Sequence, residues 1–347
     1  MKLSKKTMLV AACLEAVLIS TGSATTINWT NAAGGNWSVA ANWSPNQVPG
    51  SSDDAVITNA GAYTVTLNTS PTVNTLTLGG GSGQQTLSLP AAGYTLTLNN
   101  ASVVNPGGIL ALGGGVLYDK GGMNVGGEIY WTGGLLGVAD VEVDIATNGI
   151  LVLAGVSGNT YSLGQPLSNA GTVQLVSGDL QINYGYYGSM VNLPGGVVEI
   201  TADVSIVQYG GGPGFSNQGL IVKSGGTGTS TIANNPFNNS GTVEANTGTI
   251  SLDSAPANLS TGSLFIGAGQ TVLSGGTAIL NGSMTCSNLV LTGAVFEGNG
   301  VLYGTLVWTG GLLGVNNNTL TLDTNATLVV AGANGATMSL IKPNRAV

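Results

Sequence analysis

The sequence contains no histidine and very little charge. Seven Lys and Arg and 15 Asp and Glu among 347 residues make 6% charged side chains, whereas globular domains usually carry about 25%. The absence of histidine excludes imidazole catalysis and histidine-ligated metal sites. Few basic residues and a pI near 4.2 also argue against nucleic-acid binding, which needs Lys and Arg at phosphates. No cofactor or metal site is predicted.

Cysteine is almost absent as well. There are two cysteines, and Cys13 falls in a segment that we interpret below as a removable signal, which leaves Cys286 alone. A mature chain with a single cysteine forms no intramolecular disulfide. Because Cys286 has no histidine to activate it, we expect it to pack as a small apolar residue and not to act as a nucleophile.

Residues 1–24 have the pattern of a secretory signal peptide. A basic start, a mostly apolar stretch and a run of small residues follow one another: Lys2, Lys5 and Lys6, then Met8–Ile19, then Gly22–Ala24. Glu15 interrupts the apolar stretch, so a cytosolic amphipathic helix is the alternative. A membrane anchor is less favoured because the stretch is shorter than about 20 residues. We predict a secreted, extracellular or cell-surface protein without a transmembrane segment, carrying four basic and 14 acidic residues after cleavage.

Beyond residue 25 the sequence alternates apolar and polar residues in short runs. Tyr63–Leu67, Thr75–Leu78 and Tyr94–Leu98 are examples of this period-two pattern, which is typical of β-strands. Clusters of Gly, Asn, Pro and Ser separate the runs, and the 57 glycines allow the backbone conformations that tight corners need. We find no convincing helical periodicity, so the predicted fold class is all-β.

Internal repeats order these strands. The octapeptide Trp131–Val138 recurs letter for letter at Trp308–Val315, 177 positions later. A shorter Asn-x-Gly element recurs at Asn169, Asn217 and Asn239, with separations of 48 and 22 residues. These separations fit two coils and one coil of roughly 22–24 residues, a period typical of solenoid proteins.

A solenoid of this period stacks each turn on the next about 4.8 Å apart and pairs the backbone groups of neighbouring turns. Inward aliphatic side chains then form one long core, and corner asparagines can stack into ladders. We expect roughly 11–14 turns at this strand spacing. Two β-sandwiches are the competing prediction, but a sandwich does not need Asn-x-Gly elements at coil spacing.

Three of the five tryptophans lie near the start of the mature chain, at Trp29, Trp37 and Trp43. We interpret residues 25–60 as a cap over the first open turn and residues 61–347 as β-solenoid repeats. The alternative is a carbohydrate-stacking platform, which makes these three tryptophans the candidate ligand-binding residues. A second large repeat starts near residue 298 and is interpreted as truncated.

Several segments resemble secreted bacterial β-strand-repeat proteins, described as autotransporter-associated or β-solenoid surface proteins. The segments are Trp29–Ser38, Asn42–Pro45, Val48–Gly50, Asp53–Ile57, Phe237–Val243 and Phe296–Gly311. The resemblance covers nearly all of the mature chain. It implies a right-handed parallel β-helix with an N-terminal Trp-rich capping segment, in an exported or surface-bound protein. It implies no reaction, and no site residues are carried over.

The best acidic constellation is Asp140, Glu142 and Asp144, which alternate along one predicted strand. Paired carboxylates serve glycoside hydrolysis or bind calcium. In the second copy of the repeat, however, neutral residues occupy the same register: Asn317, Thr319 and Thr321. We therefore interpret the acids as a solvated face. Asp53 lies in a turn-like segment, where we expect it to accept backbone hydrogen bonds.

A polysaccharide lyase or hydrolase on a β-helix is the enzymatic alternative. Such enzymes commonly need a basic group, and the mature chain offers Lys120, Lys223, Lys342 and Arg345. We predict no catalytic residues. The leading hypothesis is a secreted, non-catalytic β-solenoid that serves as a surface structural or adhesive rod, with a carbohydrate-binding module as the alternative. Its expected partners are cell-surface polysaccharide or a second copy that binds at a solenoid end.

Overall fold

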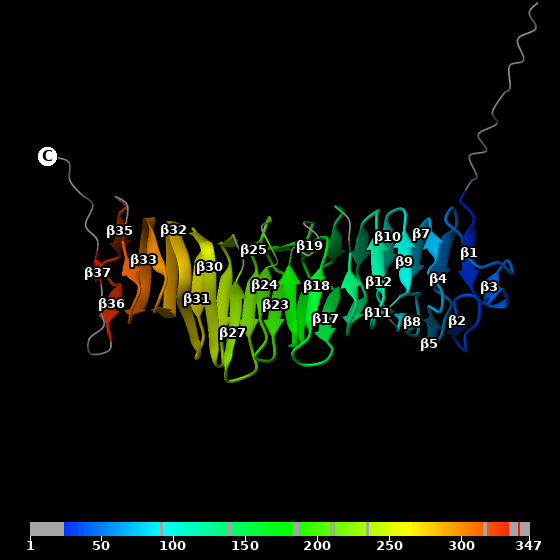
Figure 1. Ribbon diagram of the computed structural model, residues 1–347, viewed down its shortest axis with the longest axis horizontal. Coiled ribbons are helices and arrows are strands. Elements are labelled where there is room, and N and C mark those ends of the chain that lie inside the picture. The colour runs from blue at the N-terminus through cyan, green and yellow to red at the C-terminus, as the bar shows by residue number, and fades with distance from the viewer. Residues whose placement is uncertain are drawn as a thin grey trace, which may run out of the picture.

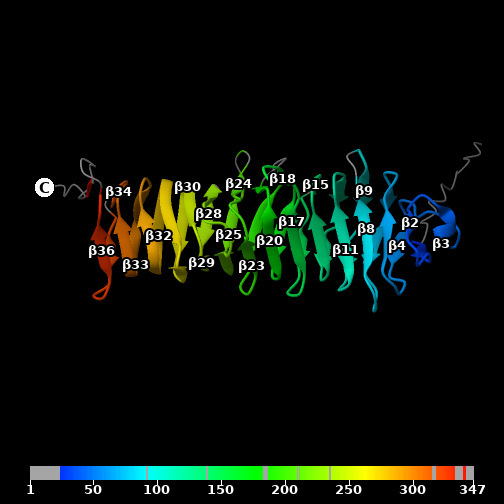
Figure 2. The same ribbon diagram turned by 90° about the horizontal axis from the view of Figure 1, so that it is seen from below.

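The chain is an all-β solenoid of about 12 turns, as the computed structural model shows (Figure 1). The structure describes residues 24–90, 93–137, 140–182, 187–208, 210, 212–233, 236–314, 318–332 and 339–340. The N-terminal turns (blue) and the C-terminal turns (red) lie at opposite ends of the rod in Figure 1 and Figure 2. The predicted fold class is thus confirmed.

Most turns contribute one strand to each of three stacks, which we call A, B and C. Stack A contains β1 (Thr26–Trp29), β4 (Asp54–Ile57), β7 (Thr75–Leu78), β10 (Ser102–Val104), β13 (Met123–Val125), β16 (Val143–Ile145), β19 (Pro166–Asn169), β22 (Ser189–Asn192), β25 (Phe215–Asn217), β28 (Phe237–Asn239), β34 (Leu312–Leu313) and β37 (Ser339–Leu340). Stack B contains β2 (Gly35–Asn36), β5 (Tyr63–Thr66), β8 (Gln85–Leu89), β11 (Gly108–Leu112), β14 (Glu128–Trp131), β17 (Ile150–Ala154), β20 (Thr172–Ser177), β23 (Val197–Ile200), β26 (Leu220–Lys223), β29 (Thr242–Ala245), β31 (Ser263–Ile266) and β35 (Leu320–Leu322).

Stack C contains β6 (Thr72–Val73), β9 (Thr95–Leu98), β12 (Val116–Asp119), β15 (Leu135–Leu136), β18 (Thr160–Leu163), β21 (Asp179–Ile182), β24 (Ile206–Gln208), β27 (Thr229–Ala233) and β36 (Thr327–Val330). Three long strands run around corners and join more than one stack: β30 (Thr249–Ser260), β32 (Gln270–Leu291) and β33 (Val295–Trp308). The 3₁₀ turn η1 (Ala40–Asn42) and strand β3 (Trp43–Ser44) complete the N-terminal end.

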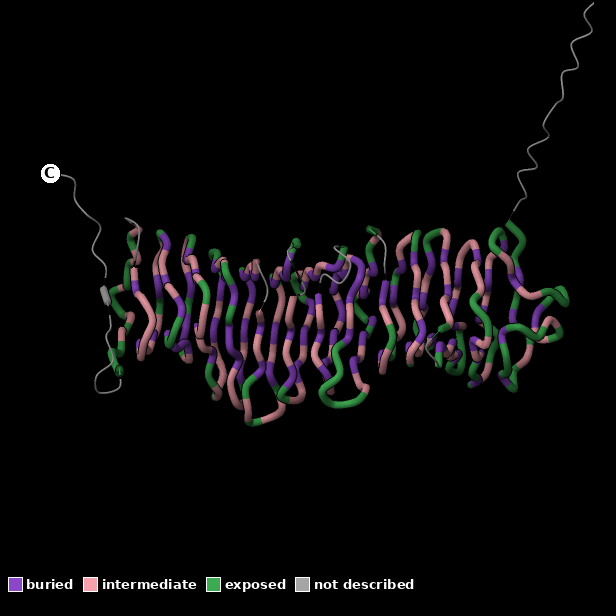
Figure 3. The backbone as a smooth tube through the Cα atoms, in the orientation of Figure 1, coloured by how far each residue is buried: buried purple, intermediate pink, exposed green. Residues whose placement is uncertain are grey.

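Neighbouring strands within each stack pair in parallel and in register. In stack B, for example, Leu87, Leu110 and Ile129 lie directly above one another and are at most 1% exposed. The alternation of buried and partly exposed residues runs along the whole rod (Figure 3). Because inward residues repeat at the same position in every turn, their aliphatic side chains form one continuous core, and each buried one contributes about 1.5–3 kcal/mol.

The corners depend on glycine at specific positions. Gly134 has a φ of +82°, and a Cβ atom there would clash with the carbonyl oxygen of Gly115 in the turn below. The equivalent glycine of the second octapeptide, Gly311, has a φ of +76°. Only a residue without a side chain fits such a corner at the spacing of stacked turns.

The two copies of the octapeptide occupy different stacks. Trp131 ends β14 in stack B, above Leu112. Trp308 ends β33 in stack C, above Leu291. The local structure is nevertheless the same, since Thr132 and Thr309 donate their backbone N–H groups to Leu112 and Leu291 at 2.8 and 2.9 Å. The duplicated unit therefore encodes a corner that works on more than one side of the rod.

The two ends of the described rod differ. At the N-terminal end, the inward residue Ile27 is fully buried. In the last turns, Leu322 and Val330 occupy inward positions above Leu302 and Trp308, yet they are 40% and 61% exposed. The core is thus closed at the first turn and open at the last described turn.

Candidate functional site

The N-terminal tryptophans form a closed aromatic cluster. Trp29, Trp37 and Trp43 are at most 1% exposed, and the ring centroids of Trp37 and Trp43 lie 4.8 Å apart in an edge-to-face arrangement. The Trp43 indole N–H donates to the Trp37 carbonyl oxygen at 2.8 Å. A sugar stacks on an exposed ring face, and these rings offer none. Their placement corrects the stacking hypothesis for these three residues and favours the packing role.

The cluster lies on turns that already belong to the solenoid. β1 pairs in parallel with β4, and β4 with β7, while β1 pairs antiparallel with β3. The segment that we expected to be a separate cap, residues 25–60, therefore contains both the antiparallel closure and the first rungs of stack A.

The three acids do not share one strand: Asp144 lies in β16, whereas Asp140 and Glu142 lie in the irregular segment before it. Asp140 and Glu142 are exposed, and Asp144 accepts a hydrogen bond from the side-chain amide of Asn124 in the turn below at 3.0 Å. No group of three or more Cys, Asp or Glu among the described residues is arranged to hold a metal. In the second copy, Asn317 lies outside the described residues, whereas Thr319 and Thr321 line the groove described below.

Two predicted structural roles are confirmed. The Asp53 carboxylate is 8% exposed and accepts the backbone N–H of Gly50 at 2.9 Å, as a turn residue does. Cys286 is 1% exposed, and burial raises the pKa of its thiol to about 12. The thiolate is the nucleophilic form, and burial disfavours it; the thiol packs in the core and donates to the Thr305 carbonyl oxygen at 3.1 Å.

Lys223, one of the basic groups considered above for an enzyme, occupies an inward position that was not predicted. It lies between Ile200 and Ala245 in stack B and is fully buried. Its ammonium donates to the Ala202 carbonyl oxygen at 3.0 Å, the Ser230 hydroxyl at 3.0 Å and the Asp203 carboxylate at 2.8 Å.

This ion pair joins a fully buried ammonium to a carboxylate that is 43% exposed. The Lys223 ammonium, with a further contribution from the Gly228 N–H, holds the pKa of the Asp203 carboxyl below its usual value. All three ammonium protons have acceptors within the protein, which satisfies every donor of this buried side chain. The period-two pattern of Leu220–Lys223 places position 223 inward and is the signal that could have revealed this residue.

A second buried polar pair lies at the end of β12. Asp119 is fully buried, and one carboxylate oxygen accepts the backbone N–H groups of Gly121 and Gly122 at 3.2 and 3.1 Å. Burial raises the pKa of this carboxyl, and the neighbouring Gln165 amide partly opposes that shift. Neither side chain reaches solvent, so neither can contact a substrate.

A buried asparagine ladder crosses four turns of stack A, as the Asn-x-Gly spacing predicted. Asn169 donates to Asn192 at 2.8 Å, Asn192 to Asn217 at 2.8 Å and Asn217 to Asn239 at 2.7 Å. All four are at most 1% exposed. Asn192 was missed because Pro194 follows it in place of the Gly of the motif. At the same inward position, the turn below Asn169 carries Ile145 and the turn above Asn239 carries Leu259.

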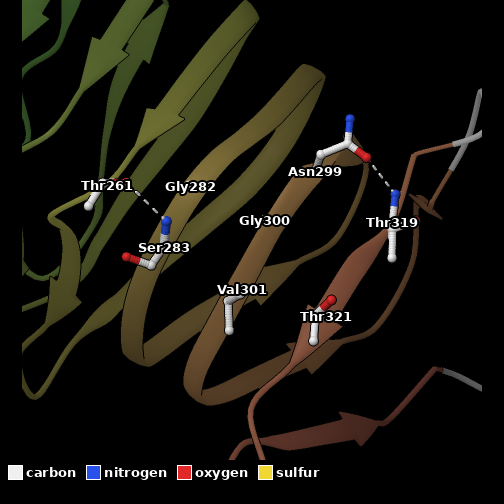
Figure 4. A pocket seen from close by; sticks show the side chains of 8 residues that line it. All are labelled: Thr261, Gly282, Ser283, Asn299, Gly300, Val301, Thr319 and Thr321. Carbon is white, nitrogen blue, oxygen red and sulfur yellow. Dashed lines mark hydrogen bonds between the residues drawn. The ribbon is translucent and has the colours of Figure 1, made fainter.

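A shallow groove of about 510 Å³ lies where stacks A and B meet, near the C-terminal end (Figure 4). It is lined by Thr261, Gly282, Ser283, Asn299, Gly300, Val301, Thr319 and Thr321. Ser283, Val301 and Thr321 stack directly above one another on successive turns. A Cβ atom on Gly282 would clash with the Thr261 hydroxyl, so the glycine helps to keep the surface hollow.

The groove carries hydrogen-bonding groups and no charge. The Asn299 side-chain oxygen accepts the backbone N–H of Thr319 at 2.9 Å, which fixes one wall (Figure 4). Within the described part of the chain, the hydroxyls of Ser283, Thr319 and Thr321 have no protein partner. Tyr303 follows Val301 by two residues and faces outward on the same strand, with 40% of its surface exposed.

Comparison with known proteins gives no family. The sequence matches no protein-family model, and no curated protein matches it. Among the described residues, no helix has the length and apolar character needed to cross a membrane. The fold and the geometry of these sites therefore carry the functional argument.

Proposed function

We propose that this chain is an exported, non-catalytic β-solenoid that serves as a structural or adhesive rod on the cell surface, like the bacterial β-strand-repeat proteins that its sequence resembles. The observation that carries the proposal is the uninterrupted stack of about 12 turns. Repetition gives such a rod its stability without disulfides. The length of the rod holds any binding surface on it at a distance from the cell.

The placement of the reactive groups supports a non-catalytic role. The carboxyl of Asp119 and the thiol of Cys286 are sealed from solvent, and the ammonium of Lys223 is committed to three acceptors. The exposed acids Asp140 and Glu142 have no basic partner on the described surface. An acid–base mechanism needs a positioned pair with tuned pKa values, and no described residues form one.

The N-terminus of the protein found outside producing cells tests the proposal. We expect mass spectrometry to find a chain that begins near residue 25, as cleavage of a secretory signal requires. Replacing Lys2, Lys5 and Lys6 by Glu removes the basic start, and we expect this control to accumulate uncleaved inside the cell. Intracellular protein that retains Met1 in the wild type would contradict export.

A further inference from the structure

We infer that the groove at the junction of stacks A and B binds a neutral, linear polysaccharide, with Tyr303 as the ring against which a sugar packs. This inference names the class of ligand for the adhesive role proposed above. It rests on that role only for where binding would take place. Binding by the purified protein is a separate property. It can be measured whether or not the chain is exported.

The chemistry of the lining selects an uncharged, hydroxyl-rich ligand. Ser283, Thr319 and Thr321 each present a hydroxyl that both donates and accepts a hydrogen bond, as sugar hydroxyls do. None of the eight lining residues is ionisable, so a neutral ligand pairs with the groove without the cost of burying an unpaired charge. An anionic polymer would find no cation there.

The geometry of the groove favours an extended chain that lies along the rod. Ser283, Val301 and Thr321 belong to three successive turns, so their side chains repeat at about 4.8 Å parallel to the rod axis. A pyranose ring is of similar length. An extended chain along the rod therefore meets the Ser283 hydroxyl, the apolar Val301 and the Thr321 hydroxyl on three consecutive turns. A compact ligand does not reach all three.

Tyr303 supplies the apolar contact that hydroxyls lack. It points outward beside the groove and leaves 40% of its surface open, in contrast to the five tryptophans, which are at most 5% exposed. Tyrosine combines an apolar ring face with a polar tip. A protein segment fits less well, because protein interfaces use apolar anchors at their centre and Val301 is the one aliphatic residue among the lining groups.

The test is retention of purified residues 25–347 on insoluble cellulose, curdlan, xylan and starch, with polygalacturonate as the anionic probe. We expect retention on at least one neutral polymer and none on polygalacturonate. Tyr303→Ala should weaken it about tenfold, which corresponds to ~1.4 kcal/mol, and Thr321→Val, which removes a hydroxyl at constant shape, should weaken it severalfold. Both side chains face outward, so thermal unfolding should be unchanged.

Tyr130 provides the matched control. It is outward on stack B and 39% exposed, but it does not line this groove, so Tyr130→Ala should bind like the wild type. The inference is overturned if no neutral polymer is retained, if polygalacturonate is retained instead, or if Tyr303→Ala binds as well as the wild type. Equal losses for Tyr130→Ala and Tyr303→Ala would also overturn it. None of these outcomes bears on export, which the N-terminal sequence tests separately.

Discussion

The side-chain amide of Asn192 donates a hydrogen bond to the side-chain oxygen of Asn217 at 2.8 Å, one turn further along the rod and out of contact with solvent. The same amide reaches the Leu220 carbonyl oxygen at 3.2 Å. Because each rung supplies the acceptor of the rung below, the ladder requires the turns to stack in one register.

Removing one rung should destabilise the rod measurably. Asn217→Ala leaves the amide of Asn192 and the side-chain oxygen of Asn239 without their ladder partners. We expect a loss of about 2–6 kcal/mol, at about 1–3 kcal/mol for each of the two groups. Asn238→Ala is the control, because Asn238 faces outward and is only half-buried. Urea unfolding should separate the two variants; equal losses would refute the buried ladder's role.

The tryptophans should be protected from solvent in the native protein. All five are at most 5% exposed, so we expect their fluorescence to resist quenching by iodide until the chain unfolds. Trp43→Ala, which deletes the ring between Trp29 and Trp37, should cost about 3–5 kcal/mol. Efficient quenching of the folded wild type would instead indicate open ring faces.

Asp119 should make stability depend on pH. Burial raises its pKa in the folded state above its ordinary value of 3.8, so the ionised form is penalised and the folded state gains stability as the pH falls through that raised pKa toward 3.8. Asp119→Asn removes the charge at the same shape. We expect it to raise the melting temperature at pH 7, with the difference from wild type shrinking in acid.

The control for this experiment is Asp144→Asn, whose carboxylate is partly exposed on the surface. It should change the melting temperature little at pH 7. If the difference in melting temperature between Asp119→Asn and the wild type stays constant across the acid range, ionisation of Asp119 is not its cause.

The exposed inward residues of the last described turns should let this chain associate with a second copy. Leu322 and Val330 are inward residues left 40% and 61% exposed, and exposed strand edges are templates for pairing. Because the tryptophan cluster closes the other end, we expect tail-to-tail dimers and not filaments. Light scattering should show that Leu322→Lys with Val330→Lys is monomeric, while Val156→Lys, at an exposed position on the side of the rod, still dimerises. A wild-type monomer at high concentration would refute this.

The sequence predicts the stacking well because repetition leaves a direct trace. The spacing of Asn169, Asn217 and Asn239 indicated both the coil length and the ladder, and each strand's alternation indicated its buried face. The sequence does not reveal where a corner falls around the rod. Trp131 and Trp308 begin identical octapeptides, yet they lie in stacks B and C, because turn lengths vary between them and shift the phase of the second copy.

The sites were harder to predict than the fold because they depend on contacts between turns, which the sequence of a single turn does not contain. Clustered tryptophans suggested a sugar platform. Whether their rings are buried depends on which residues pack over them, and the apolar–polar alternation of the sequence does not show that. The groove gathers single residues from successive turns: Ser283 and Thr321 lie 18 and 20 residues in sequence from Val301, which stacks between them. No local motif contains them together, so the register had to be known first.

Labelling of a single introduced cysteine on intact cells tests the central claim, that the folded rod is exposed at the cell surface. Asn246 lies at an exposed corner, whereas Cys286 is buried with its thiol pKa raised to about 12 and should stay silent. We predict that a membrane-impermeant maleimide labels Asn246→Cys on intact cells as fully as in a lysate, and leaves the wild type unlabelled. Labelling of Asn246→Cys only after lysis would contradict the account.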